Sequence, residues 1–262
     1  MNILEEIAGK RRQDYEARRR EITFAQVRQE AEALAAKEGE FSFPFYQALK
    51  KPSMSFICEV KKASPSKGLI APDFPYLEIA KEYEAIGAAA ISCLTEPHYF
   101  LGSDQYLKEI TDQVSIPVLR KDFTVDPYQI FEAKLLGASA ILLIVSLLDD
   151  SALIEYSSMA KSLGLSVLVE CHDEEEVDRA IRADAKIIGV NNRNLKDFTV
   201  DINNSVRLRN LVPEEIAFVS ESGVKTGADV QFLYENKTDA VLIGETLMRS
   251  SDKKATLDSF RA

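Results

Sequence analysis

The chain has no tryptophan, only two histidines and only three cysteines in its 262 residues. The cysteines form no C-x-x-C pair and the histidines stand apart from each other, so neither a zinc site nor a disulfide framework has the spacing it needs. Unpaired cysteines are typical of a reducing compartment. We therefore expect no metal and no disulfide, with Cys58, Cys93 and Cys171 as core residues and His98 and His172 as structural or rim residues.

Long apolar runs are also missing. The longest, AILLIVSLL at 140–148, is far shorter than the roughly 20 residues of a membrane helix, and its β-branched residues suit a buried strand. The N-terminal stretch MNILEEIAGKRRQDYEARRREITFAQ has no apolar signal-peptide region, and its acidic residues are unlike those of a transit peptide. We therefore expect a soluble cytoplasmic protein without a membrane partner.

An excess of positive charge is lacking too, because the formal net charge is -10 and the isoelectric point is about 4.9. Binding to nucleic acid needs a basic face, so we expect no nucleic-acid partner. Apolar residues make up 46% of the chain, which is enough to bury a large core at this length.

The chain does have a repeated pattern, which starts at about residue 54. Each repeat is a short apolar run rich in β-branched residues, then polar residues, then an amphipathic helical stretch. Strands that alternate with helices predict parallel βα units with both faces of the sheet covered. The eight candidate strands are SFICEV (55–60), AAISCL (89–94), PVLRKD (117–122), AILLIV (140–145), SVLVEC (166–171), KIIGVN (186–191), AFVSES (217–222) and AVLIGE (240–245).

The helical stretches at 76–88, 127–138 and 151–165 have apolar residues at i, i+3 and i+4, with Gly87, Gly137 or Gly164 where a C-terminal cap belongs. Eight such units in about 200 residues favour a closed (β/α)8 TIM barrel. A doubly wound sheet would usually have fewer strands and a glycine fingerprint, and neither G-x-G-x-x-G nor a Walker A motif is present.

The first 50 residues fall outside the repeat. They indicate one or two charged amphipathic helices that end near GEFSFPFYQALKKPSMS, where Phe41, Phe43 and Phe45 either cover the barrel mouth or seal its base. No linker divides the chain. We expect a single barrel domain over 1–262, of which about 1–50 is an N-terminal helical extension.

Polar side chains stand at the ends of the predicted strands, where active sites of such barrels lie. Alternation places Glu59 with Lys61 on one face, and Leu168 with Glu170 on another. Unpaired charges are costly to bury, so a cluster of both signs in one mouth favours a proton-transfer site over separate salt bridges at the rim. The strand-end residues are Glu59, Lys61, Lys121, Glu170, Asn191, Arg193, Glu221 and Ser222.

Two glycines follow the last two predicted strands. Gly223 lies in SESGVKTGAD, and Gly244 lies in LIGETLM before a short extra helix. Backbone N–H groups at such helix starts bind anions, and the loops after the seventh and eighth strands are the usual phosphate site of these barrels. The pair therefore predicts binding of a phosphorylated small molecule.

Seven motifs in order, EVKKASPSKG, LTEPHYFLGS, VLRKDFTVDPYQI, LVECH, IGVNNRNL, VSESG and LIGETLM, closely resemble the indole-3-glycerol-phosphate synthase family of tryptophan biosynthesis. The resemblance covers nearly the whole chain, including the N-terminal extension. It implies a carbon-carbon lyase, of the carboxy-lyase class, that closes the indole ring of 1-(2-carboxyphenylamino)-1-deoxyribulose 5-phosphate with loss of carbon dioxide and water. We expect a monomer that uses no cofactor.

The resemblance also implies roles for the charged residues. Lys121 would be the general acid at the ketone, and Lys61 would contact substrate anions or serve as a second acid. Each lysine would lower the pKa of the other, so that one donates a proton near neutral pH. Glu59 and Glu170 would be bases or would stabilise positive charge on the ring nitrogen.

For binding, the resemblance implies that Asn191 and Arg193 orient the open-chain sugar and the carboxylate, that Glu221 supports the lysines, and that Ser64 belongs to a loop that closes over the site. Glu245 stands where some relatives have serine, so it would help only through its N–H, with its carboxylate pointing away. The phosphate site corresponds to Ser222, Gly223, Gly244 and Glu245. Candidates for the apolar slot of the aromatic ring are Phe123, Leu142, Leu195, Phe198 and Pro65.

Two alternatives remain open. One is another phosphate-binding barrel enzyme such as phosphoribosylanthranilate isomerase, which would use a Cys and Asp acid/base pair. Here Cys58 and Cys171 have the opposite parity to Glu59 and Glu170, which puts both thiols on the helix-facing side. The other alternative is a non-catalytic barrel scaffold, which would not explain the enclosed charges.

Overall fold

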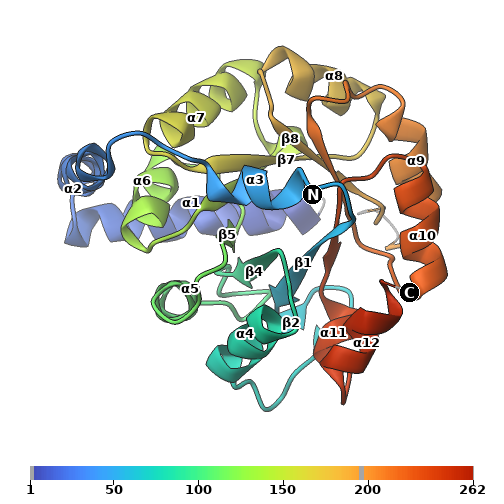
Figure 1. Cartoon of the computed structure of the whole chain (residues 1–262). Helices are drawn as coiled ribbons and strands as arrows, with labels where there is room; N and C mark the ends of the chain where they lie inside the picture. The colour runs from blue at the N-terminus through green and yellow to red at the C-terminus, as the bar shows by residue number, and fades with distance from the viewer. Residues whose placement is uncertain (1–2, 195–197, 262) are drawn as a thin grey trace.

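A computed structural model describes residues 3–194 and 198–261, and in this part of the chain eight parallel strands close into a barrel (Figure 1). The hydrogen-bonded order is β1, β10, β9, β8, β7, β6, β5, β4, so the first barrel strand pairs with the last. The predicted (β/α)8 fold is confirmed, and all eight predicted runs form strands within one or two residues. The barrel strands are β1 (Ser55–Val60), β4 (Ala90–Leu94), β5 (Val118–Lys121), β6 (Ala140–Ile144), β7 (Ser166–Cys171), β8 (Ile187–Asn191), β9 (Ala217–Glu221) and β10 (Ala240–Ile243).

Helices surround the barrel (Figure 1). The predicted helical stretches correspond to α4, α6 and α7, and the glycines that follow them have the left-handed φ of a C-terminal cap, 84° at Gly87, 82° at Gly137 and 74° at Gly164. The helices that follow the barrel strands are α4 (Tyr76–Ala85), α5 (Asp104–Thr111), α6 (Pro127–Leu135), α7 (Asp150–Ser162), α8 (Glu174–Arg182), α9 (Asn203–Arg209), α10 (Gly227–Glu235), α11 (Glu245–Arg249) and α12 (Lys253–Ser259), with a 3-10 turn η1 (Val145–Leu147) after β6.

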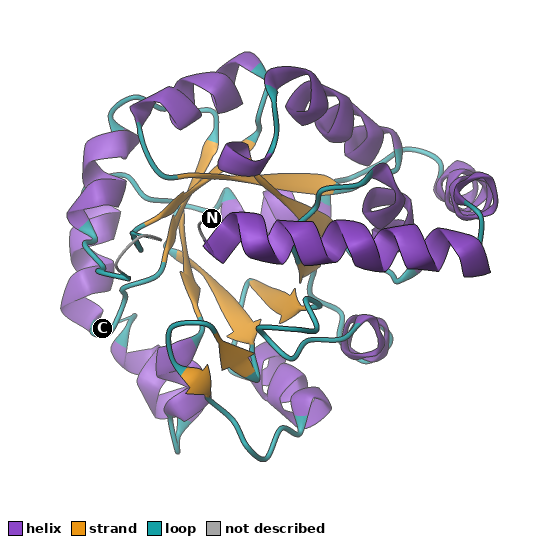
Figure 2. Cartoon of the chain, turned by 180° about the vertical axis from the view of Figure 1, so that it is seen from behind, coloured by secondary structure: helices purple, strands orange, loops and turns teal. Residues whose placement is uncertain are grey.

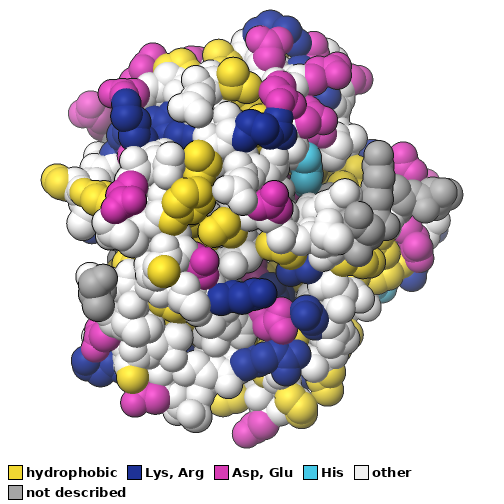
Figure 3. Space-filling view, turned by 90° about the vertical axis from the view of Figure 1, so that its right-hand side faces the viewer, with side chains coloured by type: hydrophobic (Ala, Val, Ile, Leu, Met, Phe, Trp, Pro, Cys, Tyr) yellow, Lys and Arg dark blue, Asp and Glu magenta, His cyan; other side chains and the backbone are white. Residues whose placement is uncertain are grey.

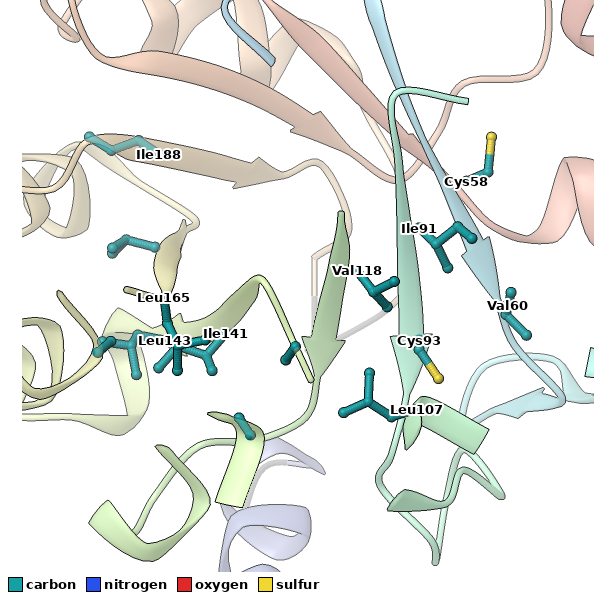
Figure 4. Close-up of a cluster of buried hydrophobic side chains, with 14 of the residues drawn as sticks. Cys58, Val60, Ile91, Cys93, Leu107, Val118, Ile141, Leu143, Leu165 and Ile188 are labelled. Carbon is teal, nitrogen blue, oxygen red and sulfur yellow. The ribbon is translucent and has the colours of Figure 1, made fainter. Parts of the chain in front are cut away.

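The strands separate two apolar clusters because successive side chains point to opposite faces. The inner cluster fills the barrel and includes Ile57, Leu119 and Leu168. The outer cluster lies between the strands and the helices, and Cys58 and Cys93 belong to it (Figure 4). Cys171 belongs to it as well, so the predicted helix-facing side of the cysteines and their place in the core are confirmed.

The N-terminal extension folds into α1 (Ile3–Glu21), α2 (Phe24–Glu38) and α3 (Pro44–Leu49). Helix α3 closes the base of the barrel, where Phe45 is fully buried and the Tyr46 N–H donates to Ser166 Oγ at the start of β7. Of the two places left open for the phenylalanine segment, the base is therefore correct. Helix α1 lies across the opposite end, over the mouth (Figure 2).

Buried charges fasten α1 to β5. Arg11 donates from Nε and Nη2 to the two carboxylate oxygens of Asp122, at 3.0 and 2.7 Å. Arg120 Nη2 donates to the Tyr15 hydroxyl at 2.7 Å and to Glu132 at 2.8 Å. A bidentate pair between buried partners has a strict geometry, so these contacts set where α1 lies relative to β5.

The surface carries charges of both signs. On the face drawn in Figure 3, Lys and Arg side chains are interspersed with Asp and Glu. No helix in the described residues has both the length and the apolar character to span a membrane.

Candidate active site

A cavity of about 440 Å³ opens at the carboxyl ends of the barrel strands. Side chains at matching strand ends converge there because all eight strands are parallel. The cavity lining includes all thirteen residues predicted for the site, namely Glu59, Lys61, Ser64, Lys121, Phe123, Glu170, Asn191, Arg193, Glu221, Ser222, Gly223, Gly244 and Glu245.

Two residues at the end of β1 form an ion pair in this cavity. The Lys61 ammonium contacts Glu59 Oε1, and Ser92 Oγ donates to Glu59 Oε2 at 3.5 Å. Glu59 is buried, whereas Lys61 is partly exposed to the cavity. The pair therefore presents its cationic end to a ligand.

A second cation lies between two carboxylates from other strands. Lys121 Nζ, at the end of β5, is 3.4 Å from Glu170 Oε2 on β7 and 3.8 Å from Glu221 Oε2 on β9. The Asn191 amide on β8 donates to the other oxygen of Glu170 at 3.2 Å. Four strands thus bring one ammonium, two carboxyl groups and an amide into contact.

The two carboxyl groups differ in their affinity for a proton. Burial, followed by the charge of Glu170, raises the pKa of Glu221 to about 8. Burial also raises the pKa of Glu170, but this effect is outweighed by Lys121, His172 and Asn191, so the pKa of Glu170 is lowered overall. Glu170 is therefore the more acidic of the two, and Glu221 is the first of them to take up a proton.

The expected lowering of the lysine pKa by a second cation is wrong for Lys121. Burial does lower it, but the carboxylates Glu170, Glu221 and Glu59 raise the pKa of Lys121 well above its ordinary value. Lys61 is neutralised by Glu59 and so does not act as the perturbing cation. Lys121 stays protonated and is held as a proton donor by its acidic neighbours.

Glycine in the interior of β8 makes room for Glu221. A Cβ on Gly189 would lie 2.2 Å from Glu221 Oε1, a distance that no side chain tolerates. Sequence reasoning missed this residue. The signal was there, since a glycine within a strand marks a close approach by another group.

Two turns form the end of the cavity where phosphate binding is predicted. Ser222 and Gly223 after β9 both have left-handed φ, 66° and 98°. Gly244 after β10 precedes the short helix α11, as predicted. Its φ is -112°, so the turn itself does not require glycine. A Cβ there would lie 2.3 Å from Glu59 Oε1 and 2.8 Å from Lys61 Nζ, so glycine is needed because the ion pair packs against it.

Glu245 pairs with two basic residues. Arg249 Nε donates to Glu245 Oε1 at 3.1 Å, and Lys67 Nζ lies 3.8 Å from the same oxygen. Lys67 lies between the two short strands of a hairpin, β2 (Ala63–Ser64) and β3 (Gly68–Leu69), which follows β1. The predicted loop after β1 therefore has a defined hairpin, visible with α1 on the same side of the barrel in Figure 2.

Apolar residues form one wall of the cavity. Of the ring-slot candidates, Pro65, Phe123 and Phe198 line it. Leu142 belongs to the inner cluster of the barrel, and Leu195 lies outside the described residues. The sequence analysis missed further apolar lining residues, among them three on α1 and one in the segment after β4. These four residues are Ile3, Leu4, Ile7 and Phe100.

Within the described residues, no group of three or more His, Cys, Asp or Glu side chains has the geometry of a metal site.

Arg193 also belongs to the polar part of the cavity. Its N–H donates to Asn191 Oδ1 at 3.1 Å, and its guanidinium donates to the Phe198 carbonyl at 3.4 Å. Asn191 thus links Arg193 to Glu170.

Comparison with known proteins agrees with this arrangement. The model of the family described as indole-3-glycerol phosphate synthase matches residues 4–260. The indole-3-glycerol phosphate synthase of Ruminiclostridium cellulolyticum is 58% identical over 99% of this chain and 98% of its own, and that of Leuconostoc mesenteroides is 49% identical over the same shares. A thiamine phosphate pyrophosphorylase from Pyrococcus furiosus shares the fold alone, with a TM-score of 0.59 and 13% identity over 82% of this chain and 95% of that one. With its barrel, its strand-end charges and these relatives, the chain belongs to the indole-3-glycerol phosphate synthase family.

Proposed function

We propose that this protein converts 1-(2-carboxyphenylamino)-1-deoxyribulose 5-phosphate into indole-3-glycerol phosphate, as the tryptophan-biosynthesis enzyme of its family, a carboxy-lyase. The observation that carries the proposal is the contact of Lys121 with Glu170 and Glu221 in a cavity that is also lined by apolar residues and by the glycine turns after β9 and β10, which we propose as the anion site. These parts match an aromatic ring, a ketone and a phosphate on one small molecule.

In the first step the ring carbon that bears the carboxylate attacks the ketone carbon, and a carbon-carbon bond forms. The ketone oxygen takes up electrons and needs a proton, which Lys121 donates. A lysine held between two carboxyl groups is fully protonated before the reaction. Glu221, with its pKa of about 8, is able to return a proton to Lys121 near neutral pH.

Attack removes the aromaticity of the ring and leaves positive charge on its nitrogen. The ionised Glu170 stabilises this charge because it is buried and held in place by Asn191 and Lys121. Loss of carbon dioxide then returns the bonding electrons to the ring. Loss of the new hydroxyl as water, with a proton from an acid of the site, and removal of a proton by a carboxylate from the methylene carbon beside the nitrogen complete the indole.

The electrons of this sequence stay within the substrate, so the proposed reaction needs no cofactor. The ring nitrogen acts as the electron source and the ketone as the acceptor. We propose the Glu59 and Lys61 pair as the contact for the substrate carboxylate or as a second acid, with Arg193 orienting the open-chain sugar. We further propose that the protein acts as a cytoplasmic monomer on a phosphorylated small molecule, without nucleic-acid or membrane partners.

The direct test is the appearance of indole fluorescence when the carboxyphenylamino substrate is added to the purified protein. The isomerase alternative is tested by adding phosphoribosylanthranilate and measuring its consumption. The fully buried Cys58 and Cys171 in the outer cluster leave no thiol from these two positions in the cavity, which favours the synthase. Absence of indole formation would overturn the proposal.

Changing Gly244 to Ala is expected to raise KM by about tenfold or more, which corresponds to ~1.4 kcal/mol of binding free energy, and to lower kcat as well. The added Cβ would come too close to Glu59 and Lys61 and would displace both side chains from the proposed anion site. Steady-state kinetics and calorimetric titration with inorganic phosphate measure both effects. The matched control is Gly9→Ala on α1, where the new Cβ meets nothing within 4 Å. Unchanged phosphate affinity in Gly244→Ala would place the phosphate elsewhere.

Changing Glu245 to Ala is expected to leave phosphate affinity equal or slightly higher. The variant keeps the backbone N–H and frees Arg249 and Lys67 from their shared carboxylate. Glu214→Ala is the control, because it removes the same charge as Glu245→Ala does. Glu214 pairs with Lys237 at the other end of the barrel. A large loss of phosphate affinity in Glu245→Ala alone would contradict the backbone site.

A further inference from the structure

His172 lies two residues beyond Glu170, and its partly buried ring stands between two carboxylates. Its Nδ1 is 3.0 Å from Glu176 Oε2 on α8, and its Nε2 is 3.4 Å from Glu170 Oε1. Glu176 Oε2 also accepts from the backbone N–H of His172 at 2.7 Å, and the Asn204 amide on α9 donates to the His172 carbonyl. Glu176 on α8 therefore orients the ring, and Asn204 on α9 holds the backbone that carries it.

These contacts define which nitrogen carries the proton. A carboxylate only accepts, so Nδ1 must donate to Glu176. Nε2 is buried and makes no hydrogen bond to any residue that the structure describes. In the neutral ring, Nε2 would turn a lone pair toward the anionic oxygen of Glu170. In the imidazolium ring it turns an N–H toward that oxygen instead.

The charged groups around the ring favour the imidazolium. Glu170 faces it from β7, Glu176 from α8 and Glu221 from β9, while the cation Lys121 on β5 lies on the far side of Glu170. Burial lowers the pKa of His172, but the hydrogen bond to Glu176 and the charge of Glu170 outweigh it and raise the pKa above 6.5.

A second hollow gives the ring access to solvent protons. A polar cavity of about 510 Å³ adjoins the active site and shares Leu4, Asn191 and Arg193 with it. His172 and Glu176 line this second hollow. The ring therefore lies between the catalytic carboxylate and an independent polar opening, so its charge can follow the pH of the solution.

We propose that His172 is a positioning residue for Glu170, which as an imidazolium forms an ion pair from Nε2 to Glu170 Oε1 and holds that carboxylate toward Lys121. The proposal depends on the proposed function only through the role of Glu170. Deprotonation of the ring replaces the cation with a lone pair and releases Glu170. The ion pair is present below the pKa of His172 and is lost as the pH rises through it, so kcat falls on the alkaline side.

Two substitutions separate the two ends of the ring. In His172→Gln, the amide nitrogen of the new side chain lies near the position of Nε2 and is a donor that does not titrate. Asn in His172→Asn places its amide nitrogen near Nδ1 and keeps only the Glu176 side. We expect His172→Gln to keep kcat within a few-fold and to lose the alkaline decline, and His172→Asn to lose roughly tenfold in kcat at all pH values.

Glu176→Gln supplies a third measurement. It removes one of the charges that raise the pKa of His172, so the alkaline decline should move to lower pH. Glu221, whose pKa is about 8, also titrates in this range. An alkaline decline that persists unchanged in His172→Gln would therefore assign it to another group such as Glu221 and overturn the proposal.

The ring is also observable without any assay of activity. The chain has only two histidines, so the imidazole nitrogen signals in an NMR titration are assigned by comparison with His172→Gln. We expect the Nε2 proton of His172 to appear below its pKa, and Glu170→Gln to lower that pKa. If the pKa of His172 were the same in Glu170→Gln as in the wild type, the contact between His172 and Glu170 would be overturned. If that pKa fell as expected but the wild-type protein formed no indole, only the proposed function would be contradicted.

Discussion

Replacing Lys121 by alanine is expected to lower turnover by about 100- to 10,000-fold, the usual cost of losing a general acid. Lys121 Nζ is the cation that contacts both Glu170 and Glu221. Without it, these two carboxyl groups share one buried site and the remaining protons settle between them, so the donor at the ketone is lost. The fold should survive, because a carboxyl group that loses its partner can take up a proton rather than stay charged.

The measurement is indole formation in a single turnover, together with product binding and thermal unfolding. Lys50→Ala is the matched control, since Lys50 also pairs with a carboxylate, Asp239, but at the base of the barrel. We expect the control to turn over like the wild type, and Lys121→Ala to keep measurable product affinity. Turnover within tenfold of the wild type would remove Lys121 from the role of general acid.

Replacing Glu170 by glutamine is expected to slow the chemical step by about 100- to 1,000-fold, as the loss of a preorganised electrostatic group does in other enzymes. The amide has the shape of the carboxylate and still accepts from the Asn191 amide through its oxygen. What it lacks is the negative charge that stabilises the cationic ring. The effect should therefore appear in kcat, with KM and the melting temperature changed little.

Rapid-quench measurement of ring closure separates the chemical step from product release. Glu214→Gln, an exposed carboxylate at the base that pairs with Lys237, is the charge-matched control. Because Glu170 also raises the pKa of Lys121, the variant should lower that pKa and move the alkaline limit of the remaining activity downward. Unaffected ring closure in Glu170→Gln would exclude the carboxylate from stabilising the charged ring.

Local patterns along the chain were enough to predict the barrel. Each barrel strand is an apolar run of four to six residues with regular alternation, and closure requires only that eight such runs occur with helices between them. Alternation also told which side chains share a face, so Glu59 with Lys61 and Leu168 with Glu170 were placed correctly. The positions of the glycines after β9 and β10 were enough to predict the two turns that line the cavity.

The tertiary structure alone decided how those residues act on one another. The sequence left the place of Phe45 open, and only the packing of α3 against β1 and β7 put it at the base. The pKa of Lys121 is raised instead of lowered because the negative charges of Glu170, Glu221 and Glu59, which come from other strands, outweigh the effect of burial. The need for glycine at 189 and 244 likewise comes from Glu221 and Glu59, which are distant in the chain.

The physical reason is the range of each effect. Strand alternation and helix capping depend on neighbours within a few residues, so the sequence by itself determines the fold class, the inward-facing residues and the end of the barrel that holds the site. Charge interactions and close contacts depend on distances of a few ångströms between side chains from different strands. Barrel closure sets those distances, and it alone brings His172 and Lys121 to opposite oxygens of Glu170.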